Sequence, residues 1–551
     1  MVRIFAICAA FAASVTNVIY AGGLVHDGEY YVLESQHGER WSAEDKEIDA
    51  RLAEIKARNG GYPPNILYIL IDDVGFGQMG NPSLNYVMGI ETPNINKLAD
   101  EGLSLMRMYT EPSCTPTRTA MLTGRHPIRT GLKEVKGVIV GEGLAGSEVT
   151  LAEVLSEAGY RTSHVGKWHQ GDIEESYPHN QGFDYAAFPI HQQVQLSLMT
   201  EEGADAFRLI GFSEKTQSNA FDMDSTFKPW GLVTGVEAVK GGTATEVDLQ
   251  PGEKWTQQHY VEMNERYQRQ VLEQLKDLAN GNQPFFLQYW PLWPINFVND
   301  QEQNLSANGG HFAEKMQRLD GMLGELFNEV DNLGIADNTI VMLMSDNGPM
   351  HVFPQSASGF NQLIYRGGKT QHLEGGVRVD SFIRWPGVIE AGSRVGDIVH
   401  VSDLFTTFSR IAGATQHIPT DRIIDGLDQT ALLLKGEHHG RRDYVYIYEN
   451  EVLRSVVKRE FKMHLPAPGV PGAFAGVFNV YRDPREEDPY IGQSLWSSAS
   501  FQNIVKRHQL TIAQYPHAKL GKGKPYEGID NLRPESKEAV EFFMSWQPPA
   551  Q

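Results

Sequence analysis

The chain has 551 residues, of which 41% are hydrophobic and 21% charged, a composition typical of a globular protein with a sizeable core. The 69 acidic residues outnumber the 48 Lys and Arg residues, which gives a formal net charge of −21. No Lys/Arg-rich run offsets this charge, so binding to nucleic acid or to an anionic membrane is not expected. An anionic ligand would have to be held by a local basic pocket.

Residues 1–21 have the pattern of a signal peptide: an Arg near the start, the apolar run IFAICAAFAASV, and small residues before a cleavage site near Ala21. The sequence therefore predicts a periplasmic or secreted protein. No other stretch is apolar enough to span a bilayer, so no integral membrane segment is expected after cleavage. Export would remove Cys8 and leave Cys114 without a disulfide partner in an oxidising compartment.

Residues 22–61 are polar and charged. We interpret them as an N-terminal arm on the surface, in which SAEDKEIDARLAEIKARNG forms a short solvated helix that ends at Gly60 and Gly61.

Between residues 62 and 440, apolar strand patterns alternate with helical patterns, and the strand patterns are NILYILI, RTSHVGK, PFFLQYW and TIVMLMS. The alternation predicts an α/β domain with helices on both faces of a sheet, whose ligands would lie beyond the carboxyl ends of the strands. Residues 201–256 show no clear period, and we interpret them as an insertion over the site.

After about residue 440 the pattern changes to the short β-like stretches DYVYIYE, LRSVVKR and GVFNVYRD, followed by the helical PESKEAVEFFMSW. Residues 441–551 are therefore predicted to form a smaller C-terminal α+β subdomain.

Pairs of residues with oxygen-bearing side chains follow two of the predicted strands: Asp72 and Asp73 follow the first, and Asp346 and Asn347 follow a later one. Their side chains supply the hard oxygen ligands that a divalent cation such as calcium prefers. The sequence therefore predicts a metal site at the carboxyl edge of the sheet.

Two further segments suit an anion. Lys167 and His169 directly follow a predicted strand, and Lys369 and Arg378 flank a Gly-rich turn that allows close approach of the backbone. Together with a metal ion, these groups describe a site for a tetrahedral anion.

Cys114 precedes Pro116 and a predicted helix from about Thr117 to Thr123, so it would lie at a helix N-terminus. The free N–H groups there favour an anion or a thiolate. A thiol is nonetheless a poor partner for a hard cation, and an oxygen nucleophile would suit the site better.

The stretch CTPTR followed by LTGR resembles the signature of the type I sulfatases, in which the cysteine is oxidised to formylglycine. The motifs DDVGFG, GKWH, QGFD, SDNG and RGGK…EGGVR occur in that family's order across most of the chain. The resemblance implies an alkaline-phosphatase-like α/β/α sandwich with a smaller C-terminal domain. It also implies calcium as cofactor, a sulfated small molecule or carbohydrate as substrate, and a formylglycine-generating enzyme as maturation partner.

Carried over motif by motif, the resemblance also implies roles for single residues. The calcium ligands would be Asp72, Asp73, Asp346, Asn347 and the modified Cys114. Arg118 would support the hydrated aldehyde, His169 would assist the nucleophile, and Lys167 and Lys369 would hold the sulfate.

The chain departs from the family's pattern at two places. Ile295 occupies the position where the family usually has a histidine that contacts the leaving oxygen, and Gln170 replaces the usual leucine after GKWH. For the leaving-group role, Asn296, His311 and His191 are the alternatives that the sequence offers.

Three functions are therefore considered: a sulfatase, a phosphate or phosphonate ester hydrolase of the same fold, and an inactive carbohydrate-binding relative. Trp290, Trp293 and Trp230 are candidates for stacking on a sugar or an aryl ring, with core packing favoured for the first two.

Overall fold

The computed structural model describes residues 23–136, 140–189, 235–242, 245–246, 256–295, 310–350, 364–466, 476–489 and 491–524. The predicted signal peptide, the helical pattern at 534–546 and most of the 201–256 segment lie outside these residues.

Four parallel strands form the centre of the larger sheet: β4 (Arg161–Gly166), β8 (Phe285–Trp290), β1 (Asn65–Ile71) and β9 (Thr339–Ser345), side by side in that order. These are the strands that the sequence predicts. Every residue of β1, β8 and β9 is buried, as continuous apolar runs require when both faces of a sheet are covered.

The sheet has eleven strands in the described part of the chain. Beyond β9 lie β11 (Ser381–Arg384), β2 (Leu103–Tyr109), β10 (Arg378–Val379) and β12 (Ser393–His400). Beyond β4 lie β5 (Tyr185–Phe188), β6 (Val236–Val239) and β7 (Thr245–Glu246). The last two strands fall within the 201–256 segment, so part of that segment extends the sheet.

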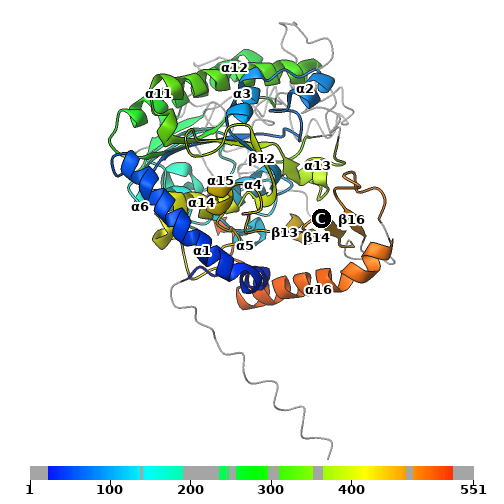
Figure 1. Ribbon diagram of the computed structural model, residues 1–551. Helices are drawn as coiled ribbons and strands as arrows, with labels where there is room; N and C mark the ends of the chain where they lie inside the picture. Colours follow the sequence, from blue (N-terminus) through cyan, green and yellow to red (C-terminus); the bar gives the residue numbers. More distant parts are fainter. Residues whose placement is uncertain are drawn as a thin grey trace, which may run out of the picture.

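Helices cover both faces of this sheet, which gives the predicted α/β/α arrangement (Figure 1). One layer holds α3 (Pro93–Glu101), α11 (Gln257–Ala279) and α12 (Gly310–Asn332), with the short α2 (Pro82–Met88) at its end. The other layer holds α4 (Cys114–Thr123), α6 (Leu151–Glu157), α14 (Asp403–Ile411) and α15 (Thr430–Lys435). None of the described helices is long and apolar enough to cross a lipid bilayer.

A second, antiparallel sheet contains β13 (Tyr444–Glu449), β14 (Val452–Lys458), β15 (Phe461–His464) and β16 (Val477–Asn479). Three of these strands match the stretches predicted to be β-like, whereas β15 and the long helix α16 (Ile491–Gln514) were not predicted. Residues of α16 and of this sheet share a small apolar core that is separate from the main one.

The N-terminal segment differs from the solvated arm expected from the sequence. Residues Gly28–Arg58 form one helix, α1, which lies against α15 and α16 (Figure 1). Leu33 and Trp41 pack into the same small core as the second sheet, and Ile48 and Ile55 are also buried. The helix is therefore longer than expected and joins the interior of the protein.

Candidate functional site

The two pairs of residues with oxygen-bearing side chains meet at the carboxyl edge of the larger sheet, as their positions after strands predict. β1 and β9 are adjacent and parallel, with Ile71 opposite Ser345, so the residues that follow them must lie side by side. The backbone N–H of Asp73 donates to Oδ1 of Asp346 at 3.0 Å, and Nδ2 of Asn347 donates to Oδ1 of Asp73 at 2.7 Å.

This cluster of oxygen atoms fits a divalent cation. Asp72, Asp73, Asp346 and Asn347 are fully buried, and ligand atoms of Asp72, Asp346 and Cys114 lie within 4.8 Å of one another. Oδ1 of Asn347 is buried without a hydrogen-bond partner among the described residues. Burial, and then repulsion from Asp72, raise the pKa of Asp346 well above its usual range, and burial also raises the pKa of Asp73. A bound cation would relieve this repulsion and use the free amide oxygen.

Three cationic side chains surround the carboxylates. Nη2 of Arg118 lies 2.9 Å from Oδ1 of Asp72 and 3.0 Å from Oδ2 of Asp346. Nζ of Lys167 lies 2.5 Å from Oδ1 of Asp72, and Nζ of Lys369 lies 2.7 and 2.8 Å from the two oxygens of Asp73. Burial would raise the pKa of Asp72, but Lys167, Lys369 and Arg118 outweigh it and hold that pKa well below its usual range. The site therefore holds charged groups of both signs away from water.

Local geometry directs Lys167 into this cluster. Gly166, the last residue of β4, has φ 105°, and a Cβ there would lie 2.0 Å from the carbonyl oxygen of Trp290. Only glycine allows the strand to turn so close to its neighbour.

Arg118 is held in place by an aromatic ring as well as by the carboxylates. Its guanidinium carbon lies 4.6 Å from the centre of the Trp290 ring, which makes a cation–π contact with it.

Cys114 is the first residue of α4, so the helix begins three residues earlier than the predicted Thr117 and Pro116 lies within its first turn. The expected placement of Cys114 at a helix N-terminus is nevertheless confirmed. Cys114 is 1% exposed. Burial would lower the pKa values of the neighbouring Arg118 and Lys369, but the nearby carboxylates outweigh it and raise them.

His169 has a left-handed backbone (φ 58°), and its Nε2 contacts the carbonyl oxygen of Lys136 at 3.0 Å. Nε2 therefore carries the proton, and Nδ1 is left as a buried acceptor with no partner in the described part of the chain. Burial, reinforced by the charges of Lys167 and Arg118, lowers the pKa of His169 well below its usual value. The ring is thus neutral and has a free lone pair.

Other candidates from the sequence do not join the cluster. The Arg378 guanidinium donates to the carbonyl oxygen of Met106 and packs over the rings of Phe76 and Tyr365. Ile295 is fully buried, as are Trp290 and Trp293, so these two tryptophans have the core role that the sequence favoured. Asn296, His191, Trp230 and the side chain of His311 lie outside the described residues.

The structure also shows contacts that motif reasoning missed. Gln170 accepts a hydrogen bond from Oγ1 of Thr119 at 2.7 Å and donates to the carbonyl oxygen of Thr115 at 3.2 Å, so it ties the turn carrying His169 to helix α4. Behind α4, Glu111 contacts His126 at 2.8 Å and His400 at 3.7 Å in a buried cluster. His400 is far from the other two residues in sequence, and no motif brings the three together.

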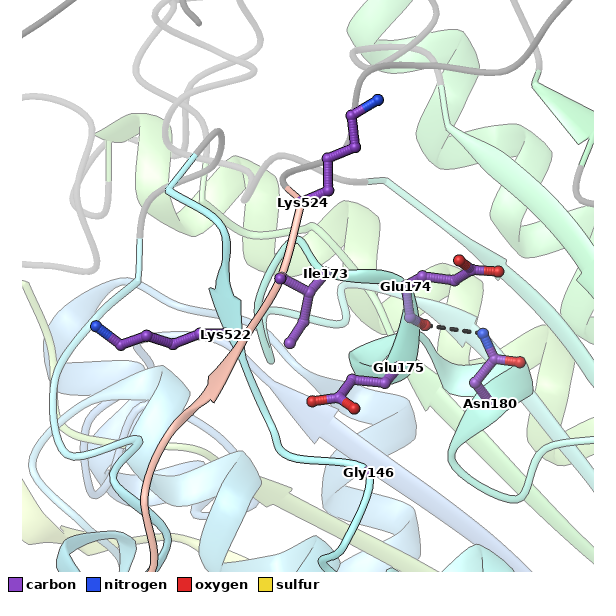
Figure 2. Close-up of a pocket in the computed structure, with 8 residues that line it drawn as sticks. Gly146, Ile173, Glu174, Glu175, Asn180, Lys522 and Lys524 are labelled. Atoms are coloured by element: carbon purple, nitrogen blue, oxygen red, sulfur yellow. Dashed lines mark hydrogen bonds between the residues drawn. The ribbon is translucent and has the colours of Figure 1, made fainter.

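A pocket of about 510 Å³ is lined in part by Gly146, Ile173 and Asn180 (Figure 2). Its lining includes Glu174 and Glu175 on one side and Lys522 and Lys524 near the strand β17 (Gly521–Lys522), which pairs with β3 (Glu142–Gly143). None of the predicted catalytic or metal-binding residues is among its lining residues, so it is separate from the candidate site.

A family model, two related sequences and a solved structure that resemble this chain all point to the same family. Residues 64–414 match the family model described as Sulfatase. The chain is 31% identical to steryl-sulfatase of Rattus norvegicus, covering 79% of this chain and 86% of the relative, and 28% identical to N-acetylgalactosamine-6-sulfatase of Mus musculus, covering 90% and 92%. The crystal structure of PsFucS1 sulfatase from Pseudoalteromonas sp. superposes with a TM-score of 0.75 at 27% identity, covering 87% of this chain and 96% of that one.

Proposed function

The chain belongs to the sulfatase family and is a sulfuric ester hydrolase with an alkaline-phosphatase-like fold, and on that premise we propose how it works. The proposal is that it cleaves a sulfate ester with a formylglycine made from Cys114 and a calcium ion as cofactors. The observation that carries it is the cluster of buried carboxylates and cations around Cys114 at the carboxyl edge of the sheet.

Calcium would be held by Asp72, Asp73, Asp346 and Asn347, together with the modified residue 114. When bound, the ion supplies positive charge that stabilises an oxygen nucleophile and the negative charge of the sulfate group. The buried, mutually repelling carboxylates and the free Oδ1 of Asn347 support this assignment.

Formylglycine made from Cys114 would, as its hydrate, supply hydroxyl groups that serve as the oxygen nucleophile toward a sulfate ester. Because Nδ1 of His169 is an unprotonated buried acceptor, we assign it the role of accepting a hydroxyl proton. Arg118, fixed by Asp72, Asp346 and the Trp290 ring, would hold the hydrate in place.

Lys167 and Lys369 would bind the sulfate oxygens and offset the charge that develops as the bond between sulfur and the bridging oxygen breaks. Asp72 and Asp73 fix the two ammonium groups before substrate arrives, so little reorganisation is needed during the reaction. The family's usual histidine is replaced by Ile295, which cannot donate a proton, and this places more of the stabilisation on the lysines.

The substrate would be a sulfated small molecule or a sulfated carbohydrate. The relatives include a steryl-sulfatase and an N-acetylgalactosamine-6-sulfatase, whose names cover both chemistries. We further propose that the protein is exported to the periplasm or secreted, since residues 1–21 have the pattern of a signal peptide.

The test combines mass spectrometry with kinetics. The peptide containing residue 114, taken from active enzyme, is expected to carry an aldehyde, and Cys114→Ala is expected to abolish turnover while the protein stays folded. One aryl alcohol is then assayed as its sulfate, phosphate monoester and phosphodiester. Unmodified Cys114 in an active preparation would contradict the nucleophile, and faster turnover of a phosphate ester would favour the alternative hydrolase.

A further inference from the structure

Lys369 lies on a segment with little regular structure of its own. Between Tyr365 and Val377, the described elements are limited to the single turn α13 (Glu374–Val377). On the side of the larger sheet, the backbone N–H of Lys369 donates to the carbonyl oxygen of Pro349 at 2.9 Å, and that of Thr370 donates to the carbonyl oxygen of Pro112 at 2.6 Å. Within the segment, the N–H of Gly375 donates to the carbonyl oxygen of Arg366 at 2.8 Å, and the carbonyl oxygen of Gly376 accepts the N–H of Gly348 at 2.9 Å.

Further contacts to this segment come from the second sheet and from the loop that follows it. Glu449, at the end of β13, accepts the backbone N–H of His372 at 2.8 Å. Glu486, in the loop after β16, accepts the backbone N–H of Glu374 at 2.7 Å, and its own carbonyl oxygen accepts Nη2 of Arg366 at 2.7 Å. Two carboxylates outside the larger sheet thus hold the main chain on the C-terminal side of Lys369.

A fully buried lysine holds these groups together. Nζ of Lys462, on β15, lies 3.1 Å from Oε1 of Glu374 and 3.0 Å from Oε1 of Glu486. Nε2 of His464 contacts the same oxygen of Glu486 at 2.7 Å, and the Tyr109 hydroxyl donates to the other oxygen of Glu374 at 3.0 Å. Burial would raise the pKa of Glu486, but Lys462 and His464 lower it to about 2, so the carboxylate stays charged.

We propose that Lys462 is a positioning residue for sulfate-ester hydrolysis: by holding Glu374 and Glu486 together, it places the segment that carries Lys369. The proposal rests on the role assigned to Lys369 under the proposed function. Without the ammonium, Glu374 would keep Arg378, 3.4 Å from its Oε2, and Glu486 would keep His464, but the two Oε1 atoms that Lys462 bridges would face each other as like charges and move apart. Since Glu486 also binds the backbone of Glu374, that movement would be passed along the main chain toward Lys369. The second sheet would therefore help to position a catalytic residue that lies outside it.

The experiment is a double-mutant cycle with Lys462→Met, Lys369→Ala and the combined variant, assayed as holoenzyme with para-nitrophenyl sulfate. Lys462→Met is expected to lower kcat/KM about 10- to 100-fold in the wild-type background, as expected for a misplaced catalytic group. In the Lys369→Ala background the same change is expected to cost about twofold or less, because the group that it positions is absent.

Lys458→Met is the matched control. Lys458 lies on the neighbouring strand β14 and makes ion pairs with Glu29 and Asp443, at 2.8 and 2.7 Å, and both partners are remote from the Lys369 segment in sequence. Its effect on kcat/KM is expected to be small and equal in both backgrounds. If Lys462→Met does not fold, as judged by thermal unfolding, the same cycle is run with Glu486→Gln, which keeps the side-chain length and removes the charge facing Lys462.

Two results would overturn the proposal: equal losses from Lys462→Met in both backgrounds, or wild-type kcat/KM in Lys462→Met. A wild-type rate in Lys369→Ala alone would instead overturn the role of Lys369 in the proposed function. The two failures are therefore distinguishable.

Discussion

Ile295, which follows β8, has an apolar and fully buried side chain, so under the proposed function it cannot donate a proton to the leaving oxygen. A departing alcohol carries more negative charge as the bond to sulfur breaks, and an ammonium near its oxygen helps most in the transition state. Lys369 is charged and fixed on Asp73, and Asp73 raises the pKa of Lys369 well above its usual value although burial opposes this.

Lys369→Ala is expected to lower turnover about 100- to 1000-fold, which is the usual cost of removing one preorganised donor. The loss should be larger for a poor alkyl leaving group than for an activated aryl one, because the alkoxide needs more stabilisation. Steady-state kinetics over a series of sulfate esters measures this. Lys97→Ala, which removes an exposed lysine on α3, serves as the control. Equal losses across the series would restrict Lys369 to binding the non-bridging oxygens.

The sequence indicates most of this residue-level arrangement, because the charged residues follow strands or glycines in short motifs. It does not reveal Gln170 as the link between the His169 turn and helix α4, because that contact depends on the packing of two elements. The contact of Lys462 with Glu374 and Glu486 is hidden for the same reason.

At the scale of elements, the proposed metal site depends on the register of β1 and β9. Ile71 lies opposite Ser345, so a shift of one residue would move Asp72 and Asp73 away from Asp346 and Asn347. Burial, and then repulsion from Asp72, raise the pKa of Asp346, as expected of a site that favours a bound cation.

Asp346→Asn is expected to leave the thermal stability of the metal-free protein unchanged or raised, because it removes one of the repelling carboxylates. The same variant should lose most of the rise in Tm that calcium gives the wild type. Differential scanning calorimetry with chelator, calcium or zinc tests both points, and calcium is expected to stabilise the wild type more than zinc does. A full calcium-dependent rise in Asp346→Asn would contradict the assignment.

The stability of the metal-free wild type should also depend on pH through Asp346, and it should increase as this carboxylate becomes protonated. Because burial and Asp72 raise the pKa of Asp346, the folded state binds a proton more tightly than the unfolded chain does. The contribution of Asp346 to stability therefore improves as the pH falls through its raised pKa. Asp346→Asn is expected to weaken this dependence in urea-unfolding curves recorded as a function of pH.

Strands are the elements that the sequence predicts well, since short continuous apolar runs such as NILYILI are typical of strands buried on both faces of a sheet. Helix α1 is the counterexample. Its buried residues Leu33, Trp41, Ile48 and Ile55 are spaced seven or eight apart, so a narrow apolar stripe is hidden among charged neighbours. From the sequence alone, such a pattern indicates a solvated helix, because it does not reveal the surface against which the stripe packs.

For the whole molecule, one buried cluster of charges joins segments that are far apart in the chain. Asp27, the N-cap of α1, contacts Arg129 of α5 (Pro127–Thr130) at 2.9 Å and His508 of α16 at 2.7 Å. Arg129 also pairs with Asp425 at 2.7 Å, and the Tyr446 hydroxyl donates to Asp27 at 3.1 Å. The helices α1, α5 and α16 and the second sheet therefore share one network of ion pairs and hydrogen bonds.

Asp27→Ala is expected to lower the free energy of unfolding by about 3–5 kcal/mol at neutral pH, because it leaves Arg129 and His508 buried with fewer partners. Burial would raise the pKa of Asp27, but His508 and Arg129 lower it, so its contribution is present above the usual carboxyl pKa and is lost as the pH falls through the lowered one. Denaturant unfolding at several pH values measures this. Wild-type stability in the variant would show that α1 is held by apolar packing alone.

The burial of Cys114 has a consequence for the order of events in the cell. With 1% of its surface exposed, and at the start of a helix enclosed by the sheet and its neighbouring helices, its sulfur is out of reach of another protein once the chain has folded. Under the proposed conversion, the maturation enzyme must therefore meet the chain before folding is complete. The fraction of active molecules is then set by the rate of Cys114 modification relative to the rate of folding. A chain that folds first is kinetically trapped as a stable, inactive protein with its thiol intact, so faster synthesis would increase the amount of protein while lowering its specific activity.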